Sequence, residues 1–186
     1  IAQDEVSFSA IKKMLSIKKR DFPQLLEIIE PYVTITETGM IIKNLELKEY
    51  LLGDHLYSLD DDEREELHQM FIDYYSQAEH VNDLYAVKCI PYHLLAIEDA
   101  TSILRIILAK PRREYQFFLN QIIRRPNALS NNSTISTIIE GLLRDKSGVG
   151  YKYIMGVIEY VALDSGNYYL GNNLLERIDS NTLSNL

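Results

Sequence analysis

Apolar residues recur at helical spacing in two short segments at the start of the chain. The first segment, residues 7–17, places Phe8, Ile11 and Leu15 on one face behind Ser7, which is a suitable N-cap. The second begins at Asp21 and ends at Pro31, and its apolar stripe is formed by Leu25, Leu26, Ile28 and Ile29. The pattern therefore predicts two helices in succession.

The spacing then changes to that of β-strands. Residues 33–43 place Val33 and Ile35 before a turn at Thr38 and Gly39, and Met40, Ile41 and Ile42 after it, which predicts a hairpin. Residues 44–52 return to helical spacing, and Gly53 is a typical helix stop. Two helices, a hairpin and a third helix form the winged-helix pattern, which we assign to residues 1–56.

The remainder of the chain, residues 57–186, predicts an all-α domain. A helix begins near Ser58, with Ser or Asp as its cap and an apolar face formed by Leu67, Met70, Phe71 and Tyr74. Residues 82–108 continue as helices, and Pro91 predicts a break or kink. Further helices are predicted near 111–124, 134–144, 149–163 and 168–178. The fold class is thus mainly α, and the helix lengths after residue 80 suit the stacked helical pairs of a solenoid.

The composition is that of an ordinary soluble globular protein, with 46% hydrophobic and 25% charged residues in 186. The formal net charge of -8 disfavours a sequence-independent nucleic-acid binder, which needs excess basic charge. The acidity is local, because residues 54–66 carry seven acids against Arg64 alone. We interpret this run as a device that complements a helix N-terminus, and the alternative is an acidic docking surface.

The single cysteine, Cys89, has apolar neighbours, which predicts a buried and inert thiol without an internal disulfide. This usage favours a reducing, cytoplasmic compartment. No run reaches the about 18 to 20 apolar residues of a membrane span, so a membrane partner is not expected. The chain opens at Ile1 without a Met, which predicts a fragment of a longer protein.

Catalytic and metal-binding motifs are not found in the sequence. The four histidines, His55, His68, His80 and His93, have none of the spacings of a zinc site, and no phosphate-binding loop or nucleophile motif is present. We therefore expect no metal site and no catalysis by this chain alone. His68 and His93 fall in amphipathic segments, where a hydrogen-bonded structural role is favoured.

Two groups of basic residues are candidates for binding. The first group, which precedes the second helix, comprises Lys18, Lys19 and Arg20. In DNA-binding winged helices this second helix enters the major groove. Here it carries Glu27 and Glu30, which would face phosphates, and the wing carries Glu37. A packing role is favoured over DNA binding. The second group brackets the predicted helix near 111–124 and comprises Lys110, Arg112, Arg113, Arg124 and Arg125. It is interpreted as a solvated face or an ion-pair partner of the acidic run, and the alternative is a dock for an acidic partner or phosphate.

Taken in order, the segments resemble a region of the signal-transduction ATPases of the NACHT and NB-ARC (STAND) class, which includes apoptosome-like proteins. Residues 8–52 resemble the winged helix of that class. Residues 59–108 are similar to the helical segment that follows it, in which a Tyr-x-x-x-x-x-Pro-Tyr-His-Leu motif is matched by Tyr85, Pro91, Tyr92, His93 and Leu94. The resemblance covers about residues 5–110.

The resemblance implies a place in a larger protein. In this family a His after the wing contacts the β-phosphate of ADP, and Asn44 stands at the matching position. Asn can donate a hydrogen bond but cannot carry imidazolium charge. ADP or ATP would be bound by the parent ATPase rather than by this chain, and the expected partners are the upstream nucleotide-binding domain and other proteins.

Three functions follow as hypotheses. The first is a non-catalytic regulatory region that packs on the nucleotide-binding domain and relays its conformational change. The second is a winged-helix transcriptional regulator with a helical dimerisation domain. The third is a helical scaffold that binds peptides in a groove, for which Tyr151, Tyr153, Tyr168 and Tyr169 are candidates, although such tyrosines more often line a core.

Overall fold

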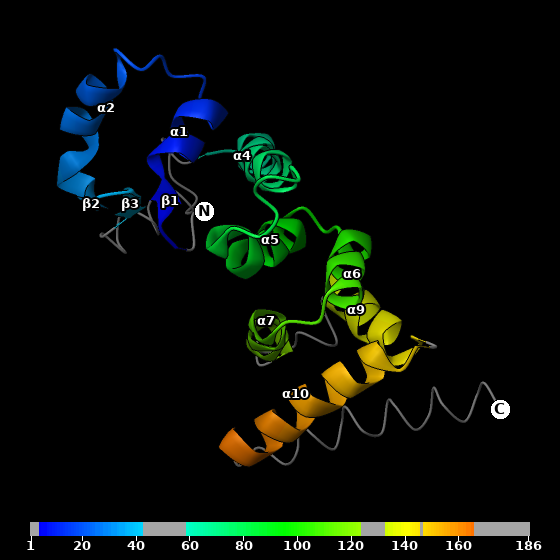
Figure 1. The fold of residues 1–186 in the computed structure, drawn as a ribbon. Coiled ribbons are helices and arrows are strands. Elements are labelled where there is room, and N and C mark those ends of the chain that lie inside the picture. The colour runs from blue at the N-terminus through cyan, green and yellow to red at the C-terminus, as the bar shows by residue number, and fades with distance from the viewer. Residues whose placement is uncertain (1–3, 43–58, 124–132, 146, 166–186) are drawn as a thin grey trace. The chain divides into compact units, whose positions relative to one another are not determined.

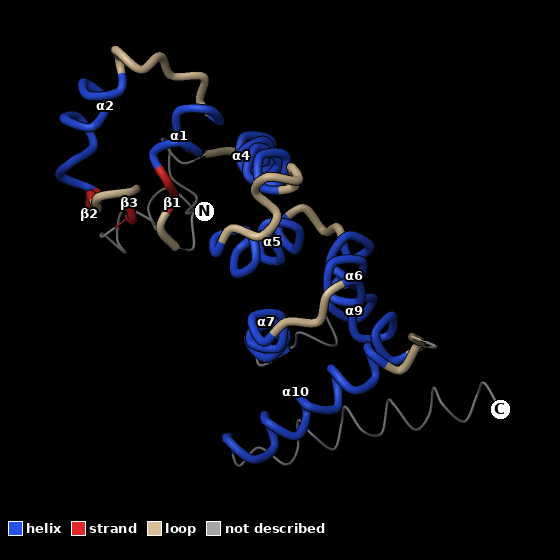
Figure 2. Tube along the Cα trace, viewed as in Figure 1, coloured by secondary structure: helices blue, strands red, loops and turns tan. Residues whose placement is uncertain are grey.

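The chain is mainly α-helical with a small antiparallel sheet near its N-terminus, as predicted (Figures 1 and 2). The computed structural model describes residues 4–42, 59–123, 133–145 and 147–165. The chain divides into two compact units, Ile1–Ile97 and Glu98–Leu186. The domain boundary predicted after residue 56 lies outside the described residues and stays a prediction. Each unit is described by itself below.

The sheet of the first unit has three strands in the order β1-β3-β2. Strands β2 (Val33–Ile35) and β3 (Gly39–Ile42) form the predicted hairpin, with Val33 opposite Ile42. Strand β1 (Val6–Ser7) was not predicted, and it pairs with β3 through Val6 and Met40. A Cβ on Gly39 would lie 2.3 Å from the carbonyl oxygen of Val6, so only glycine allows β1 to approach β3 this closely.

Helices α1 (Phe8–Met14) and α2 (Phe22–Ile29) confirm the first two predicted helices. Ser7 caps α1 as expected, because its hydroxyl accepts from the amide of Ala10 at 3.1 Å. Asp21 occupies the cap position of α2 but makes no capping hydrogen bond with its side chain. A short 3₁₀ helix, η1 (Glu30–Tyr32), leads from α2 into β2.

The core between these helices and the sheet is apolar. Phe8 and Phe22 pack edge to face with ring centroids 5.6 Å apart. The buried apolar residues are Val6, Ala10, Ile11, Phe22 and Val33. The helix predicted over residues 44–52, with Asn44 and the stop at Gly53, lies outside the described residues.

Helix α4 (Asp61–Tyr75) begins at the acidic run and confirms its interpretation as a helix start. The carboxylate of Asp60 accepts from the amide of Glu63 at 2.8 Å, and the carboxylate of Glu63 accepts from the amide of Asp60 at 3.0 Å. This reciprocal pair is a capping box, which satisfies two donors that the helix itself leaves open. Acidic residues in the first turn also interact favourably with the helix dipole.

Helix α5 (Leu84–Ala96) packs on α4 and has no break at Pro91, where the sequence predicted a break or kink. The helix runs through Pro91, which is buried, and the chain instead turns at Glu98, whose φ is +57°. A proline inside a helix removes one backbone hydrogen bond. Here the burial of the α5 side chains against α4 outweighs that loss.

The second unit is built from α6 (Ala100–Ala109), α7 (Arg113–Ile123), α9 (Ser133–Leu143) and α10 (Val149–Ser165). Helix α9 packs on α6 and on α10, and α7 packs on α10. Fully buried residues from all four helices form the core: Ile103, Ile107, Phe118, Leu119, Ile122, Ile135, Ile138, Leu142 and Ile154. The helix predicted over 168–178 lies outside the described residues. Among the helices that the structure describes, none is long and apolar enough to cross a membrane.

Candidate functional site

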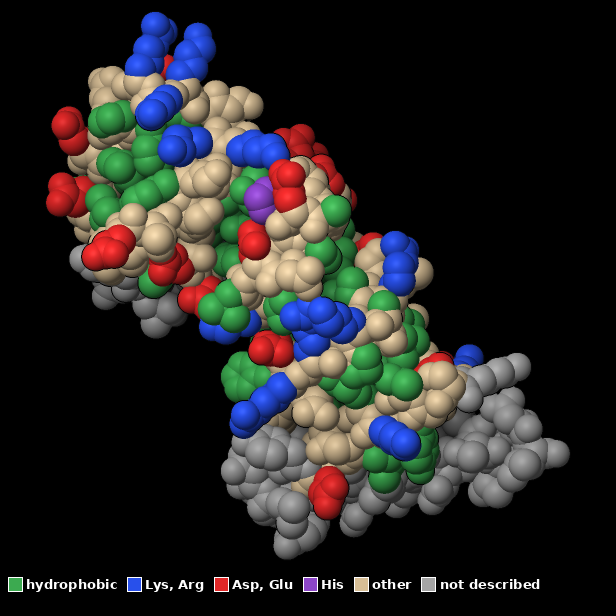
Figure 3. Space-filling view, in the orientation of Figure 1, with side chains coloured by type: hydrophobic (Ala, Val, Ile, Leu, Met, Phe, Trp, Pro, Cys, Tyr) green, Lys and Arg blue, Asp and Glu red, His purple; other side chains and the backbone are tan. Residues whose placement is uncertain are grey.

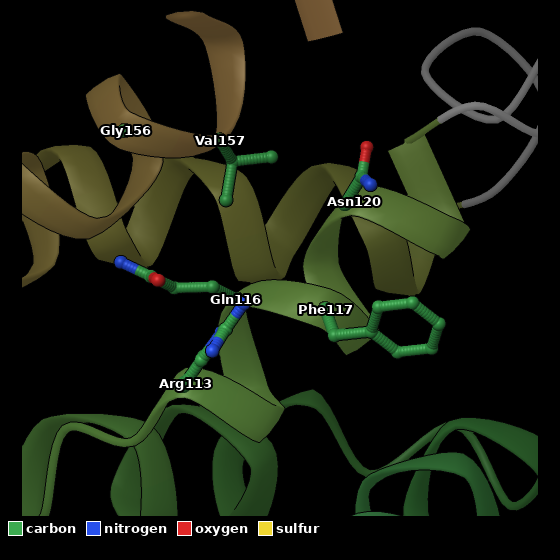
Figure 4. A pocket seen from close by; sticks show the side chains of 6 residues that line it. All are labelled: Arg113, Gln116, Phe117, Asn120, Gly156 and Val157. Atoms are coloured by element: carbon green, nitrogen blue, oxygen red, sulfur yellow. The ribbon is translucent and has the colours of Figure 1, made fainter. Parts of the chain in front are cut away.

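A pocket of about 250 Å³ lies between α7 and α10 in the second unit. Helix α7 lines it with Arg113, Gln116, Phe117 and Asn120, and α10 lines it with Gly156 and Val157 (Figure 4). The four α7 positions follow a spacing of three, one and three residues, which places them on a single stripe of the helix. In Figure 4 the side chains of Gln116 and Phe117 point in opposite directions along this stripe.

Helix α7 has one buried face and one exposed face, and the stripe that lines the pocket lies mainly on the exposed face. Tyr115, Phe118 and Leu119 are buried and hold the helix in the core, while Arg113, Gln116 and Phe117 are exposed. Phe117 has 60% of its surface exposed, which is high for a phenylalanine. The pocket thus has an exposed aromatic rim.

The opposite wall is open because α10 carries a glycine there. Among the described residues, a Cβ built on Gly156 would meet only Nε2 of Gln116, at 3.8 Å, which is ordinary van der Waals contact. Val157 beside it is 2% exposed and provides an apolar floor. The absence of a side chain at Gly156 therefore leaves the volume that the pocket occupies.

A hydrogen bond between α10 and the residue before α7 fixes the mouth of the pocket. The hydroxyl of Tyr153 donates to the backbone carbonyl of Arg112. Burial raises the pKa of Tyr153, so its hydroxyl stays protonated at neutral pH and remains a donor. This contact holds the start of α7, and with it Arg113, against α10.

The pocket combines one cation with two carboxamides. Among the described residues, no hydrogen bond or ion pair engages the guanidinium of Arg113, which lies at the surface. Gln116 is exposed, whereas Asn120 is 6% exposed. The arrangement offers a positive charge and amide donors and acceptors beside an aromatic ring and an aliphatic floor.

The structure assigns different surroundings to the members of the predicted basic group 110–125. Lys110 is exposed at the end of α6, Arg112 is half-buried before α7, and Arg113 alone lines the pocket. Arg124 and Arg125 lie outside the described residues. The predicted ion pairing of this group with residues 60–66 stays a prediction. Within that acidic run, Arg64 forms an ion pair with Asp61 at 3.7 Å.

The other basic candidates, Lys18, Lys19 and Arg20, are exposed on the loop between α1 and α2. Arg20 pairs with Asp21 at 3.1 Å, in a contact that is itself at the surface. Glu27 and Glu30 are exposed as well, so the surface around this loop carries both signs of charge.

A chain of hydrogen bonds links two histidines and a tyrosine between α4 and α5. Nδ1 of His68 lies 2.8 Å from Nδ1 of His93, and Nε2 of His93 lies 2.9 Å from the hydroxyl of Tyr85. Phe71 stacks on His93 with ring centroids 4.6 Å apart. Burial, with a smaller contribution from His68, lowers the pKa of His93 to about 3, so this ring is neutral at pH 7. Both histidines are hydrogen-bonded within helices, as predicted.

Cys89 of α5 is buried, as expected, and burial raises its pKa to about 12. The thiol therefore stays protonated and unreactive at neutral pH. Among the described residues no group of three or more histidine, cysteine or acidic side chains is arranged to hold a metal ion.

Sequence reasoning identified Arg113 but missed the other pocket residues. Gln116, Phe117 and Asn120 carry a local signal, a polar and aromatic stripe beside the apolar one on the same helix. Gly156 and Val157 become part of the site only through the packing of α10 on α7. Of the tyrosines proposed for a peptide groove, Tyr153 is buried, Tyr151 is 44% exposed, and Tyr168 and Tyr169 lie outside the described residues.

Comparison of the chain with models of protein families, with curated proteins and with solved structures finds no match.

Proposed function

We propose that this chain is a non-catalytic interaction region, in which the N-terminal helices and sheet act as a winged-helix-like packing module. The observation that carries the proposal is the exposed apolar surface that runs from α2 into β2. Ile28 is 63% exposed, Tyr32 is 49% exposed and Ile35 is 40% exposed. Figure 3 shows hydrophobic side chains gathered over α2, with charged residues at their edge. Clustered exposed apolar side chains are typical of interaction surfaces.

The weak burial of α2 supports this proposal. Phe22 is the one buried residue of the helix, although its apolar stripe continues through Leu25, Leu26 and Ile28. A helix with such a stripe normally buries it against a neighbour. Contact with a partner would cover Ile28 and remove its apolar surface from water.

The partner that we propose is the nucleotide-binding domain of a NACHT- or NB-ARC-like ATPase that contains this chain. Support comes from the ordered resemblance of residues 5–110, within which the motif residues Tyr85 and His93 are hydrogen-bonded to each other. In this proposal the chain relays opening of the ATPase and catalyses no reaction itself. The nucleotide belongs to the partner domain. Asn44 is the residue of this chain that the resemblance puts at the position of the family's phosphate-contacting His.

The first test is the reading frame that encodes the chain. It should contain a phosphate-binding loop upstream of Ile1, and a frame without one would overturn the assignment to this class. The second test is binding between the upstream segment and this chain, expressed as separate proteins and measured by calorimetry. Ile28→Asp should weaken the complex at least about 10-fold, because it places a charge in an apolar contact.

Leu84→Asp is the matched control for Ile28→Asp. Leu84 is equally exposed, at 63%, but it lies at the start of α5. The two variants lose similar apolar area, so a complex weakened equally by both would show that α2 is not the contact.

DNA binding remains the second candidate, and the exposed loop with Lys18, Lys19 and Arg20 favours it. A gel shift at low salt tests it directly. If DNA is the partner, affinity should fall steeply with added salt and be lost when these three residues are changed to Ala. An absence of any shift at low salt would exclude this candidate.

A further inference from the structure

We propose that the α7–α10 pocket binds the carboxylate of an apolar amino-acid residue, either at the C-terminal end of a peptide or in a free N-acyl amino acid. This site lies in the second unit and is independent of the N-terminal interaction surface. The proposal is based on four features of the pocket: its cation, its carboxamides, its apolar walls and its size.

Arg113 is the residue that we expect to hold the carboxylate. A guanidinium presents parallel N–H donors that match the two oxygens of a carboxylate. Arg113 has no ion pair with another described residue. The adjacent acid, Glu114, is half-buried and lies about 100° around the helix axis from Arg113, so the two side chains leave the helix in different directions. The charge of Arg113 is therefore available to a ligand anion.

Gln116 lies one turn along the same stripe from Arg113, and its side chain is exposed. Its carboxamide offers both donors and an acceptor, which is the complement of a peptide group. Asn120, a further turn along, is buried and already has a partner, so it contributes to the wall of the pocket. An amide next to the ligand carboxylate would meet Gln116. A peptide bond adjacent to a carboxylate is the chemistry of a chain end or of an N-acyl amino acid.

Phe117 and Val157 supply apolar contact for a side chain of the ligand. The ring of Phe117 is largely exposed in this structure, and a ligand side chain packed on it would remove apolar area from water. Gly156 lets the ligand approach the backbone of α10, because the nearest described atom to the position of its missing side chain is Nε2 of the flexible Gln116 side chain, at 3.8 Å.

The size and charge of the pocket favour this ligand over a nucleotide or an inorganic anion. A volume of about 250 Å³ accommodates one residue of leucine or phenylalanine size and is below the usual range for larger ligands. Phosphate sites generally use several cations or a row of backbone amides. One guanidinium next to an apolar floor fits a monovalent carboxylate on an apolar group.

Calorimetry or ligand-observed NMR with N-acetyl-phenylalanine tests the proposal on the intact chain. We expect a dissociation constant on the order of 1 mM, given the small size of the probe. N-acetyl-phenylalaninamide has the same shape without the charge, and it should bind about 10-fold more weakly. Equal affinity for the acid and the amide would overturn the proposal.

Two substitutions connect the binding to this pocket. Arg113→Gln should abolish the preference for the acid over the amide, while Arg105→Gln, which removes an exposed arginine on α6, should leave it intact. Gly156→Leu should fill the pocket and weaken binding of both probes at least about 10-fold. If that variant fails to fold, Gly156→Ala is the substitute, with a smaller loss. Binding that survives both Arg113→Gln and the substitution at Gly156 would place the probe elsewhere and overturn the assignment.

A comparison of two probes then assigns the source of the carboxylate. The pentapeptide Gly-Gly-Ser-Gly-Phe with a free carboxylate is compared with N-acetyl-phenylalanine. Binding at least about 5-fold tighter for the peptide supports recognition of a chain end. Equal affinities support a free N-acyl amino acid, and in both cases the amidated form must bind more weakly.

Discussion

At the scale of single residues, His93 is the most constrained side chain of the first unit. Its two ring nitrogens are both engaged, by His68 and by the hydroxyl of Tyr85. A neutral imidazole has one N–H, so His93 must donate from one nitrogen and accept at the other. The three residues therefore form a directional chain of hydrogen bonds that leads from a buried tyrosine to the half-buried His68.

This burial makes the stability of the protein sensitive to mild acid. The folded state lowers the pKa of His93 to about 3, whereas the unfolded chain takes up a proton near the ordinary pKa of about 6.5. Protons thus bind the unfolded state preferentially, and stability that is present above pH 6.5 is lost as the pH falls. We expect the free energy of unfolding to decrease by about 2 kcal/mol between pH 7.5 and pH 5.

Urea unfolding followed by circular dichroism at several pH values measures this effect. Burial also lowers the pKa of His68, so both histidines contribute to the slope in the same direction. His93→Gln removes the more deeply buried of the two rings, and it should reduce the slope between pH 5 and 6.5 even though the variant is less stable overall. A slope as steep in His93→Gln as in the unaltered chain would contradict the expectation.

At the scale of elements, two glycines of α10 have opposite environments. A Cβ on Gly150 would lie 2.5 Å from the carbonyl oxygen of Leu142, a backbone atom of the preceding helix. A Cβ on Gly156 would make only ordinary van der Waals contact among the described residues, with Nε2 of Gln116 at 3.8 Å. The first glycine is required by the close approach of α9 and α10, and the second is not required by packing.

Substitution by alanine should therefore act in opposite directions at these two positions. Gly150→Ala should destabilise the protein by about 2 kcal/mol, because backbone must move to relieve the clash. Gly156→Ala should stabilise it by about 0.5 to 1 kcal/mol, since alanine is the better helix former and meets no obstacle. Thermal unfolding of the two variants measures these changes in stability. A similar loss of stability in both variants would contradict the different roles assigned to the two glycines.

Local signals predicted the elements well where the deciding interaction is itself local. The caps at Ser7 and Asp60 depend on a residue and its third neighbour. The sequence predicted Ser7, and for α4 it predicted a Ser or Asp cap near Ser58 without singling out Asp60. Strand β1 was missed because two residues carry no periodicity, and its pairing depends on Gly39, far along the chain. Pro91 predicted a break that α5 does not have, because tertiary burial outweighed a local preference. The pocket itself was not predicted, and Arg113 is the one lining residue that the sequence had named as a binding candidate, because the other wall depends on the packing of α10.

At the scale of the whole molecule, the chain divides into two compact units. Cys89 is the single cysteine of the sequence and is buried in the first unit, so thiol modification reports the opening of that unit. Gly150 lies in the second unit. We expect Gly150→Ala to lower the stability of the second unit without increasing the rate at which a thiol reagent modifies Cys89.

Pulsed labelling across a urea series, with circular dichroism measured in parallel, makes this comparison. In the unaltered chain Cys89 should react slowly in native buffer and fully in concentrated denaturant. An earlier onset of Cys89 labelling in Gly150→Ala, parallel to its loss of helix, would show that the units unfold together. The corresponding control is Gly39→Ala, which alters the sheet of the first unit and should advance the labelling of Cys89.

The open position at Gly156 also makes the second unit easy to observe by spectroscopy. With the native thiol buried, Gly156→Cys would introduce the one readily reactive cysteine of the protein among its described residues. A small environment-sensitive dye attached there would sit at the rim of the pocket, beside Gln116. The fluorescence of the dye would then report in real time whether a ligand fills the pocket. The same readout would work with mixtures from which the ligand has not been purified.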